Sequence, residues 1–97
     1  MSRPAEAEQV VYVVDDDASA RDSLCWLLAT EKLPSRAFAS AGEFLDHWSA
    51  DWSGCVTLDI RMPEMSGLQV QQELARLDNR MPVIVLTGHA DLSNASR

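Results

Sequence analysis

Four aspartates stand at the ends of apolar runs, where carboxylates can take part in chemistry. Asp15, Asp16 and Asp17 follow the run VVYVV, and Asp59 ends the run CVTLD. Burying an unpaired carboxylate is unfavourable, so a cation or a reaction must compensate for such a cluster. Carboxylate oxygens suit Mg²⁺, which prefers an octahedron of oxygen ligands and keeps several waters. A carboxylate can also be a nucleophile that forms an aspartyl phosphate, with the metal neutralising the transferring group.

Strands and helices are predicted to alternate along the chain. The predicted strands are either continuous runs of apolar, β-branched residues or short segments in which apolar and polar residues alternate. The predicted helices repeat apolar residues every three or four positions. The order β-α-β-α-β-α-β predicts an α/β fold with a parallel sheet and helices on both faces. Strands are expected at residues 10–14, 35–39, 55–59 and 83–87, and helices at residues 18–31, from the capping box Ser40/Glu43 onwards, and at residues 68–77.

A parallel sheet collects the side chains at its strand ends along one rim. Ligands bind outside the carboxyl ends of such strands, and the four aspartates together with Thr87 belong there. Asp17 has two further interpretations, as a first-turn acid that complements the helix dipole or as a helix cap. In the first helix, an apolar stripe is formed by Ala20, Leu24, Leu27 and Leu28, and Trp26 lies off this stripe.

Length and charge limit the possible functions. The 97 residues allow one domain, predicted as a disordered leader at residues 1–9 and a folded unit at residues 10–97. The net charge is −7 and no block rich in lysine or arginine exists, which disfavours direct nucleic-acid binding. No apolar run reaches the roughly 18 residues of a membrane span, and the first nine residues lack the apolar part of a signal peptide. A cytoplasmic location is therefore expected.

Three segments resemble the receiver domain of bacterial two-component response regulators. They are VVDDDASARDSL, LDIRMPEMSGL and PVIVLTGHAD, and the resemblance extends over residues 10–91. The subtype is similar to the nitrogen-fixation regulators, which carry a LuxR-like DNA-binding output domain. The resemblance implies a flavodoxin-like sheet, and a phosphoacceptor that receives a phosphoryl group from a sensor histidine kinase. It also implies control of transcription through an output domain absent from this chain, and no turnover enzyme.

The resemblance implies a role for each residue of these motifs. Asp59 matches the phosphoacceptor, and Asp15 and Asp16 match the acidic pair that binds Mg²⁺ (or Mn²⁺). Within that pair, Asp16 would be the direct metal ligand, and Asp15 would act mainly through water. The other matches are the backbone carbonyl of Arg61 as the third protein ligand, Thr87 as the switch hydroxyl and Gly88 as the small residue that leaves access to the phosphoryl group.

The sequence departs from the family pattern after the fourth strand. A complete receiver has five strands and five helices, and no residue here matches the lysine that follows the fifth strand, so phosphorylation is expected to be impaired. The strand order would be 2-1-3-4, with the fourth strand as an apolar edge. A homodimer or higher oligomer is therefore expected, through residues 83–86 and apolar residues of the first helix.

Two other classes of protein remain open. One is an interaction module that keeps the receiver scaffold, is not phosphorylated and pairs through the open edge. The other is a phosphatase of the haloacid-dehalogenase kind, because Asp15 and Asp17 form a DxD motif. The segment DDDASA lacks the Thr or Val that usually follows that motif, and the chain has no cap domain, which argues against the phosphatase.

Overall fold

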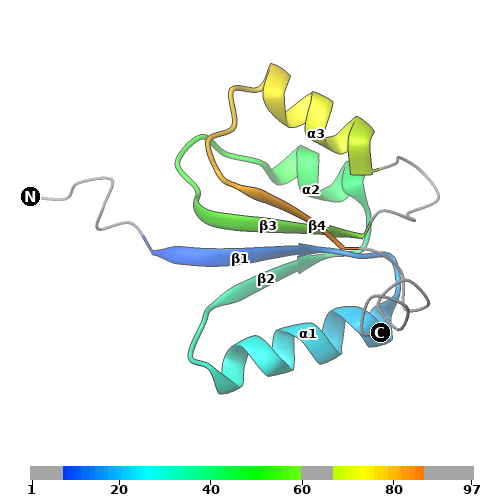
Figure 1. Cartoon of the computed structure of the whole chain (residues 1–97), viewed down its shortest axis with the longest axis vertical. Helices are drawn as coiled ribbons and strands as arrows, with labels where there is room; N and C mark the ends of the chain where they lie inside the picture. Colours follow the sequence, from blue (N-terminus) through cyan, green and yellow to red (C-terminus); the bar gives the residue numbers. More distant parts are fainter. Residues whose placement is uncertain (1–7, 60–66, 87–97) are drawn as a thin grey trace, which may run out of the picture.

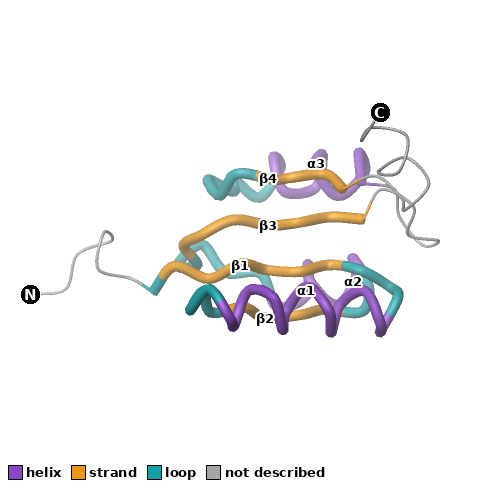
Figure 2. Tube along the Cα trace, turned by 60° about the horizontal axis from the view of Figure 1, so that its bottom comes forward, coloured by secondary structure: helices purple, strands orange, loops and turns teal. Residues whose placement is uncertain are grey.

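The computed structural model of the protein describes residues 8–59 and 67–86, which form a four-stranded parallel sheet with helices on both faces (Figure 1). Figure 2 shows the four strands side by side in the order β2-β1-β3-β4, as predicted. None of the helices in this part of the chain is both long and apolar enough to cross a membrane. The strands are β1 (Gln9–Val14), β2 (Ser35–Phe38), β3 (Ser53–Asp59) and β4 (Val83–Leu86), and the helices are α1 (Ala18–Thr30), α2 (Ala41–His47) and α3 (Gly67–Arg76).

The predicted alternation of strands and helices is confirmed, with small shifts at the ends. β1 begins at Gln9, one residue inside the segment expected to be a leader, and β3 begins two residues before the expected Cys55. The helix after Ser40 begins as its capping box predicts. The Ser40 hydroxyl accepts from the Glu43 N–H at 3.0 Å, and the Glu43 carboxylate accepts from the Ala39 N–H at 2.8 Å.

The main core lies between the sheet and the pair α2 and α3. Alternate residues of the strands point to this face, because strand side chains alternate between the two sides of a sheet. Each large side chain that is fully buried here contributes roughly 1.5–3 kcal/mol of hydrophobic stabilisation. The core consists of Val10, Tyr12, Val14, Phe38, Ala41, Phe44, Val56, Leu58, Val70, Leu74 and Met81.

A stack of aromatic rings closes one end of this core. The Trp52 ring lies on the Tyr12 ring, with 4.3 Å between centroids and 11° between planes. The Arg36 guanidinium lies 5.0 Å from the centre of the Trp52 ring, in cation–π contact. Since Tyr12 and Arg36 are partners in the β1–β2 pairing, one indole covers both of these strands.

The opposite face of the sheet carries α1 and is much more exposed to solvent. No residue of α1 is buried, and Leu27, which belongs to the predicted apolar stripe, is 53% exposed. Trp26 is 70% exposed and Ile84 of β4 is 48% exposed. The reason is that α1 is the sole helix on this side of four strands in the described part of the chain (Figure 1).

The central strand pair brings two backbones close together at Gly54. This residue pairs with Val10 of β1 and has a φ of +135°, a region that L side chains rarely adopt. A Cβ at this position would lie 1.9 Å from the Val10 carbonyl oxygen and 2.6 Å from the Val10 nitrogen. A side chain therefore cannot be accommodated here without moving the β1–β3 pairing.

We expect Gly54→Ala to lower the free energy of unfolding by about 3 kcal/mol, because the backbone must shift or remain strained. Urea unfolding followed by circular dichroism measures the change. The matched control is Gly42→Ala in α2, where the nearest atom to a new Cβ is the Ser40 hydroxyl oxygen at 3.9 Å. The control should leave stability unchanged or raise it by up to about 1 kcal/mol, and equal losses in both variants would contradict the prediction.

Candidate metal site at the carboxyl ends of the strands

Two of the predicted site residues are placed by the pairing of β1 with β3. The two strands run parallel, with Val13 opposite Thr57 and Val14 opposite Leu58. Asp15 and Asp59 are the next residues along each strand, so their backbones emerge side by side at the carboxyl end of the sheet. The register of buried apolar residues thus aligns two carboxylates of like charge.

Three of the predicted carboxylates come together at this rim. Asp15, Asp16 and Asp59 each offer an oxygen within 4.8 Å of the others. Asp15 and Asp59 are partly buried, whereas Asp16 is exposed to solvent. Among the described residues, the site is therefore accessible to solvent on the side of Asp16.

Asp17 caps α1 and is not one of the three clustered carboxylates. Its Oδ1 accepts from the Ser19 N–H at 2.9 Å and from the Ala20 N–H at 3.3 Å, and its backbone has the extended conformation of an N-cap. Its own N–H donates to Asp15 Oδ1 at 2.9 Å. Of the two structural interpretations of Asp17, the cap is the one found, and this cap also fixes one oxygen of Asp15.

Sequence reasoning missed Arg21, which also belongs to this turn. Its Nη1 donates to the Asp15 carbonyl oxygen at 2.9 Å, in a partly buried contact. The backbone N–H of Arg21 donates to the Asp17 carbonyl at 2.9 Å, the first bond of α1. A basic residue one turn after an acidic strand end was the available signal, but the sequence alone does not show which way a long side chain turns.

The shared site alters the acidity of Asp15. Burial raises the pKa of Asp15 above its ordinary value of 3.8, and the backbone hydrogen bond from Asp17 opposes this rise. The negative charges of Asp59 and Asp16, and a side-chain hydrogen bond with Asp59, raise the pKa further. Without a cation, the neighbouring carboxylates therefore disfavour the ionised form of Asp15.

These carboxylates fit Mg²⁺ in donor type and in spacing. The donors are all hard oxygens, and with bond lengths of 2.0–2.1 Å the ligands of an octahedral Mg²⁺ lie about 2.9 Å apart when adjacent and about 4.2 Å apart when opposite. The carboxylate oxygens already lie within 4.8 Å of one another, so one cation can be shared among these side chains. The remaining predicted site residues, Arg61, Thr87 and Gly88, lie outside the described residues.

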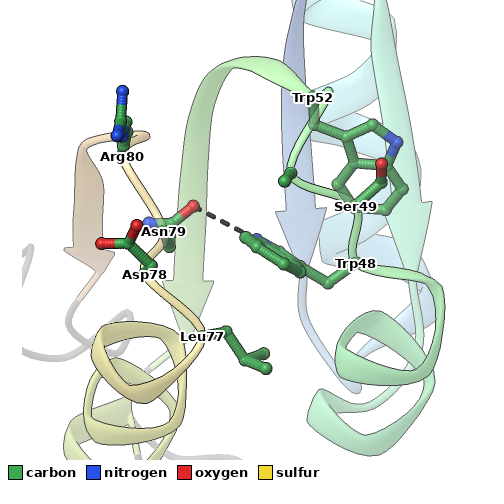
Figure 3. Close-up of a pocket in the computed structure, with 8 residues that line it drawn as sticks. Trp48, Ser49, Trp52, Leu77, Asp78, Asn79 and Arg80 are labelled. Atoms are coloured by element: carbon green, nitrogen blue, oxygen red, sulfur yellow. Dashed lines mark hydrogen bonds between the residues drawn. The ribbon is translucent and has the colours of Figure 1, made fainter.

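A hollow lies at the other end of the sheet from the acidic site, between the loops that precede β3 and β4 (Figure 3). Its volume is about 200 Å³, below the roughly 300–1,000 Å³ of usual ligand pockets. Trp48 Nε1 donates to Asn79 Oδ1 at 3.2 Å, and Asn79 Nδ2 donates to the Met81 carbonyl at 2.8 Å. These polar groups bind one another and tie the two loops together, which accounts for the hydrogen bonds of Trp48 and Asn79 without a ligand.

The raised pKa of Asp15 predicts how stability depends on pH without metal. Because the folded protein holds this proton more tightly than the unfolded chain, stability falls as pH rises from about 3.8 through the folded-state pKa. Asp15→Asn keeps the acceptor for the Asp17 N–H and removes the charge. At pH 7 in EDTA, it should raise the free energy of unfolding by several tenths of a kcal/mol to about 1 kcal/mol, since solvent screens this open site.

The control for this substitution is Asp51→Asn, which changes an exposed carboxylate in the loop before β3, at the far end of that strand from Asp59. Urea unfolding from pH 3.5 to pH 7.5 compares the three proteins. The stability difference between Asp15→Asn and the parent should grow with pH, whereas the Asp51→Asn curve should run parallel to the parent. A difference for Asp15→Asn that does not vary with pH would contradict the prediction.

Comparison with known proteins identifies the fold and the motif. Residues 11–97 match the protein family described as "Response regulator receiver domain". The transcriptional regulatory protein TdiR of Thauera aromatica is 49% identical over 81 residues, which are 84% of this chain and 36% of TdiR. The chain spans less than half the length of the curated relatives it matches.

Solved structures give the same result. The response regulator StyR superposes with a TM-score of 0.81 at 38% identity, covering 86% of this chain and 42% of StyR. FixJ-N superposes with a TM-score of 0.77 at 33% identity, covering 92% of this chain and 67% of FixJ-N. With a matching sheet order, a family match over most of the chain and an acidic rim at its strand ends, the chain belongs to the receiver domain family of two-component response regulators.

Proposed function

We propose that the chain is a phosphoacceptor that takes a phosphoryl group from a sensor histidine kinase onto Asp59. The observation that carries this proposal is the meeting of Asp15, Asp16 and Asp59 within 4.8 Å at an open rim. Three like charges at the end of a buried strand pair are unfavourable unless a cation joins them, and a hard oxygen site suits Mg²⁺ or Mn²⁺. The family match supports the same chemistry.

In the proposed reaction, a carboxylate oxygen of Asp59 forms a bond to phosphorus while the bond from phosphorus to the kinase imidazole nitrogen breaks. The imidazole leaves with that electron pair and takes up a proton from water. When bound, Mg²⁺ neutralises negative charge on the transferring phosphoryl oxygens. Asp16 and Asp59 would hold the ion directly and Asp15 through water, while Arg61, Thr87 and Gly88 keep the roles implied by the resemblance.

The wider biology belongs to the same proposal. The relatives include a protein named as a transcriptional regulator, so we propose that phosphorylation controls transcription through an output domain outside this chain. The net charge of −7 argues against direct nucleic-acid binding by this chain, and a cytoplasmic location accords with a kinase partner. The chain is proposed to act stoichiometrically, as a phosphoacceptor and not as a turnover enzyme.

Acetyl phosphate provides a direct test, because it can donate a phosphoryl group without a kinase. Incubation with acetyl phosphate and Mg²⁺ should add the mass of one phosphoryl group to the intact chain. EDTA and Asp59→Asn should each lower the labelled fraction at least tenfold, since the first removes the cation and the second the nucleophile. Intact-protein mass spectrometry measures the labelled fraction.

Asp51→Asn is the matched control, because it also removes one carboxylate but at an exposed position away from the acidic site. This variant should gain the phosphoryl group to the same extent as the parent chain. Labelling that survives in Asp59→Asn would overturn the assignment of the phosphoacceptor. Absence of any label in a chain that still binds Mg²⁺ would favour the alternative function, a receiver-like interaction module that is not phosphorylated. Sustained release of phosphate from an aryl phosphate would instead favour a phosphatase.

We further propose that the chain associates with itself through β4. Within the described residues, β4 pairs with β3 on one side alone, and its residues Ile84 and Leu86 are 48% and 38% exposed. Both side chains lie on the face that carries α1, because their partners in the register, Thr57 and Asp59, alternate with the core residues of β3. An apolar edge with unpaired backbone groups is prone to pair with a second copy.

Sedimentation equilibrium at micromolar concentration tests this association. The parent chain should sediment as a dimer or larger species, and Ile84→Lys should raise its dissociation constant at least tenfold, because a lysine on an edge strand opposes pairing. The control is Leu68→Lys on α3, which covers the other face and where Leu68 is 64% exposed. A monomeric parent chain, or equal effects of both lysines, would contradict the proposed edge.

A further inference from the structure

We propose that Arg21 is a positioning residue of the acidic site, which fixes the turn between β1 and α1 so that Asp15 and Asp16 face Asp59. This inference rests on the proposed binding of Mg²⁺ at that site. Arg21 lies in α1 and contributes no oxygen ligand itself. Its role would be to orient two carboxylates that are proposed to bind the ion. The role is mechanical, and the geometry of the turn carries it.

Arg21 holds the turn at two points. Its guanidinium Nη1 donates to the Asp15 carbonyl at 2.9 Å, and its backbone N–H donates to the Asp17 carbonyl at 2.9 Å. The side chain therefore spans back over the turn that its own backbone closes. Arg21 is also only partly exposed, although a surface arginine would ordinarily extend its charged end into water.

With Arg21 in place, Asp15 is anchored through three different groups. Its N–H donates to the Phe38 carbonyl at 3.1 Å, its Oδ1 accepts from the Asp17 N–H at 2.9 Å, and its carbonyl accepts from Arg21. The first two contacts hold Asp15 to β2 and to the capped helix. The third fixes the plane of the peptide between Asp15 and Asp16, and this plane determines where the Asp16 side chain starts.

Loss of the guanidinium would leave a partly buried carbonyl without that charged donor, which is unfavourable. The peptide would then be free to rotate toward water, and the Asp16 carboxylate would move away from Asp59. Groups that orient ligands without binding the metal typically change metal affinity by roughly 10–100-fold when they are removed. A rise of that size in the dissociation constant for Mg²⁺ is the effect expected for Arg21.

Charge alone predicts the opposite sign, which makes the inference testable. A cation held at the Asp15 backbone carbonyl repels Mg²⁺, so a neutral residue at position 21 would tighten Mg²⁺ binding if Arg21 acted only through its charge. If Arg21 acts through position, the neutral residue weakens binding. The sign of the change therefore separates the two roles.

The experiment is isothermal titration calorimetry of the folded chain with Mg²⁺, well below its melting temperature. Arg21→Met and Arg21→Gln remove the charge and the reach to the Asp15 carbonyl, and both should raise the dissociation constant for Mg²⁺ roughly 10-fold or more. Arg21→Lys keeps a cationic donor and should recover part of the lost affinity. Arg76→Met is the control, because Arg76 is an exposed arginine of α3 paired with Glu73 on the surface.

Melting in EDTA, followed by circular dichroism, shows whether each variant is folded at the temperature of the titration. The two neutral variants guard against failure of one of them to fold. Unchanged or tighter Mg²⁺ binding in a folded neutral variant would overturn the positioning role while leaving the metal site intact. A parent chain that releases or absorbs no heat with Mg²⁺, and shows no metal-dependent rise in melting temperature, would instead overturn the proposed function and this inference together.

Discussion

The parallel pairing of β1 with β3 is the constraint on which the rest of the molecule depends. The register runs from Gln9 opposite Ser53 to Val14 opposite Leu58, and it buries the inward residues of both strands almost completely. A slip of one residue would shift one strand by about 3.3 Å and turn its apolar residues to the wrong face. The hydrophobic effect therefore sets the register, and the register places Asp15 beside Asp59 against their mutual repulsion.

The sequence was sufficient for those features that depend on local pattern. Apolar runs predicted the strands, and the first residues after those runs predicted which carboxylates would meet at the rim. The capping box predicted the start of α2, because Ser40 and Glu43 interact with backbone groups only three or four residues away. Asp17 was ambiguous, since the same residue type serves as a cap, a first-turn acid or a metal ligand, and its contacts with Ser19 and Ala20 were needed to distinguish these roles.

Features that depend on the path of the chain in three dimensions were not predictable in this way. Helical spacing placed Leu27 in the apolar stripe of α1, but spacing carries no information about how much of the sheet lies opposite, and 53% of that residue remains exposed. Arg21 was missed because its hydrogen bond returns across six residues to a backbone carbonyl, which no residue pattern encodes. The hydrogen bond from Trp48 to Asn79 likewise joins two loops, and these residues are 31 positions apart in sequence.

The placement of the three tryptophans gives the domain separate optical signals for its two faces. Trp26 stands on α1 with 70% of its surface in water, so its emission should respond to whatever covers that face. Trp52 lies on Tyr12 and close to the Arg36 guanidinium, and Trp48 donates to Asn79, so both report on the packing of the opposite face. A partner that covers α1 and a loosening of the main core would consequently appear as distinct fluorescence changes in the unlabelled protein.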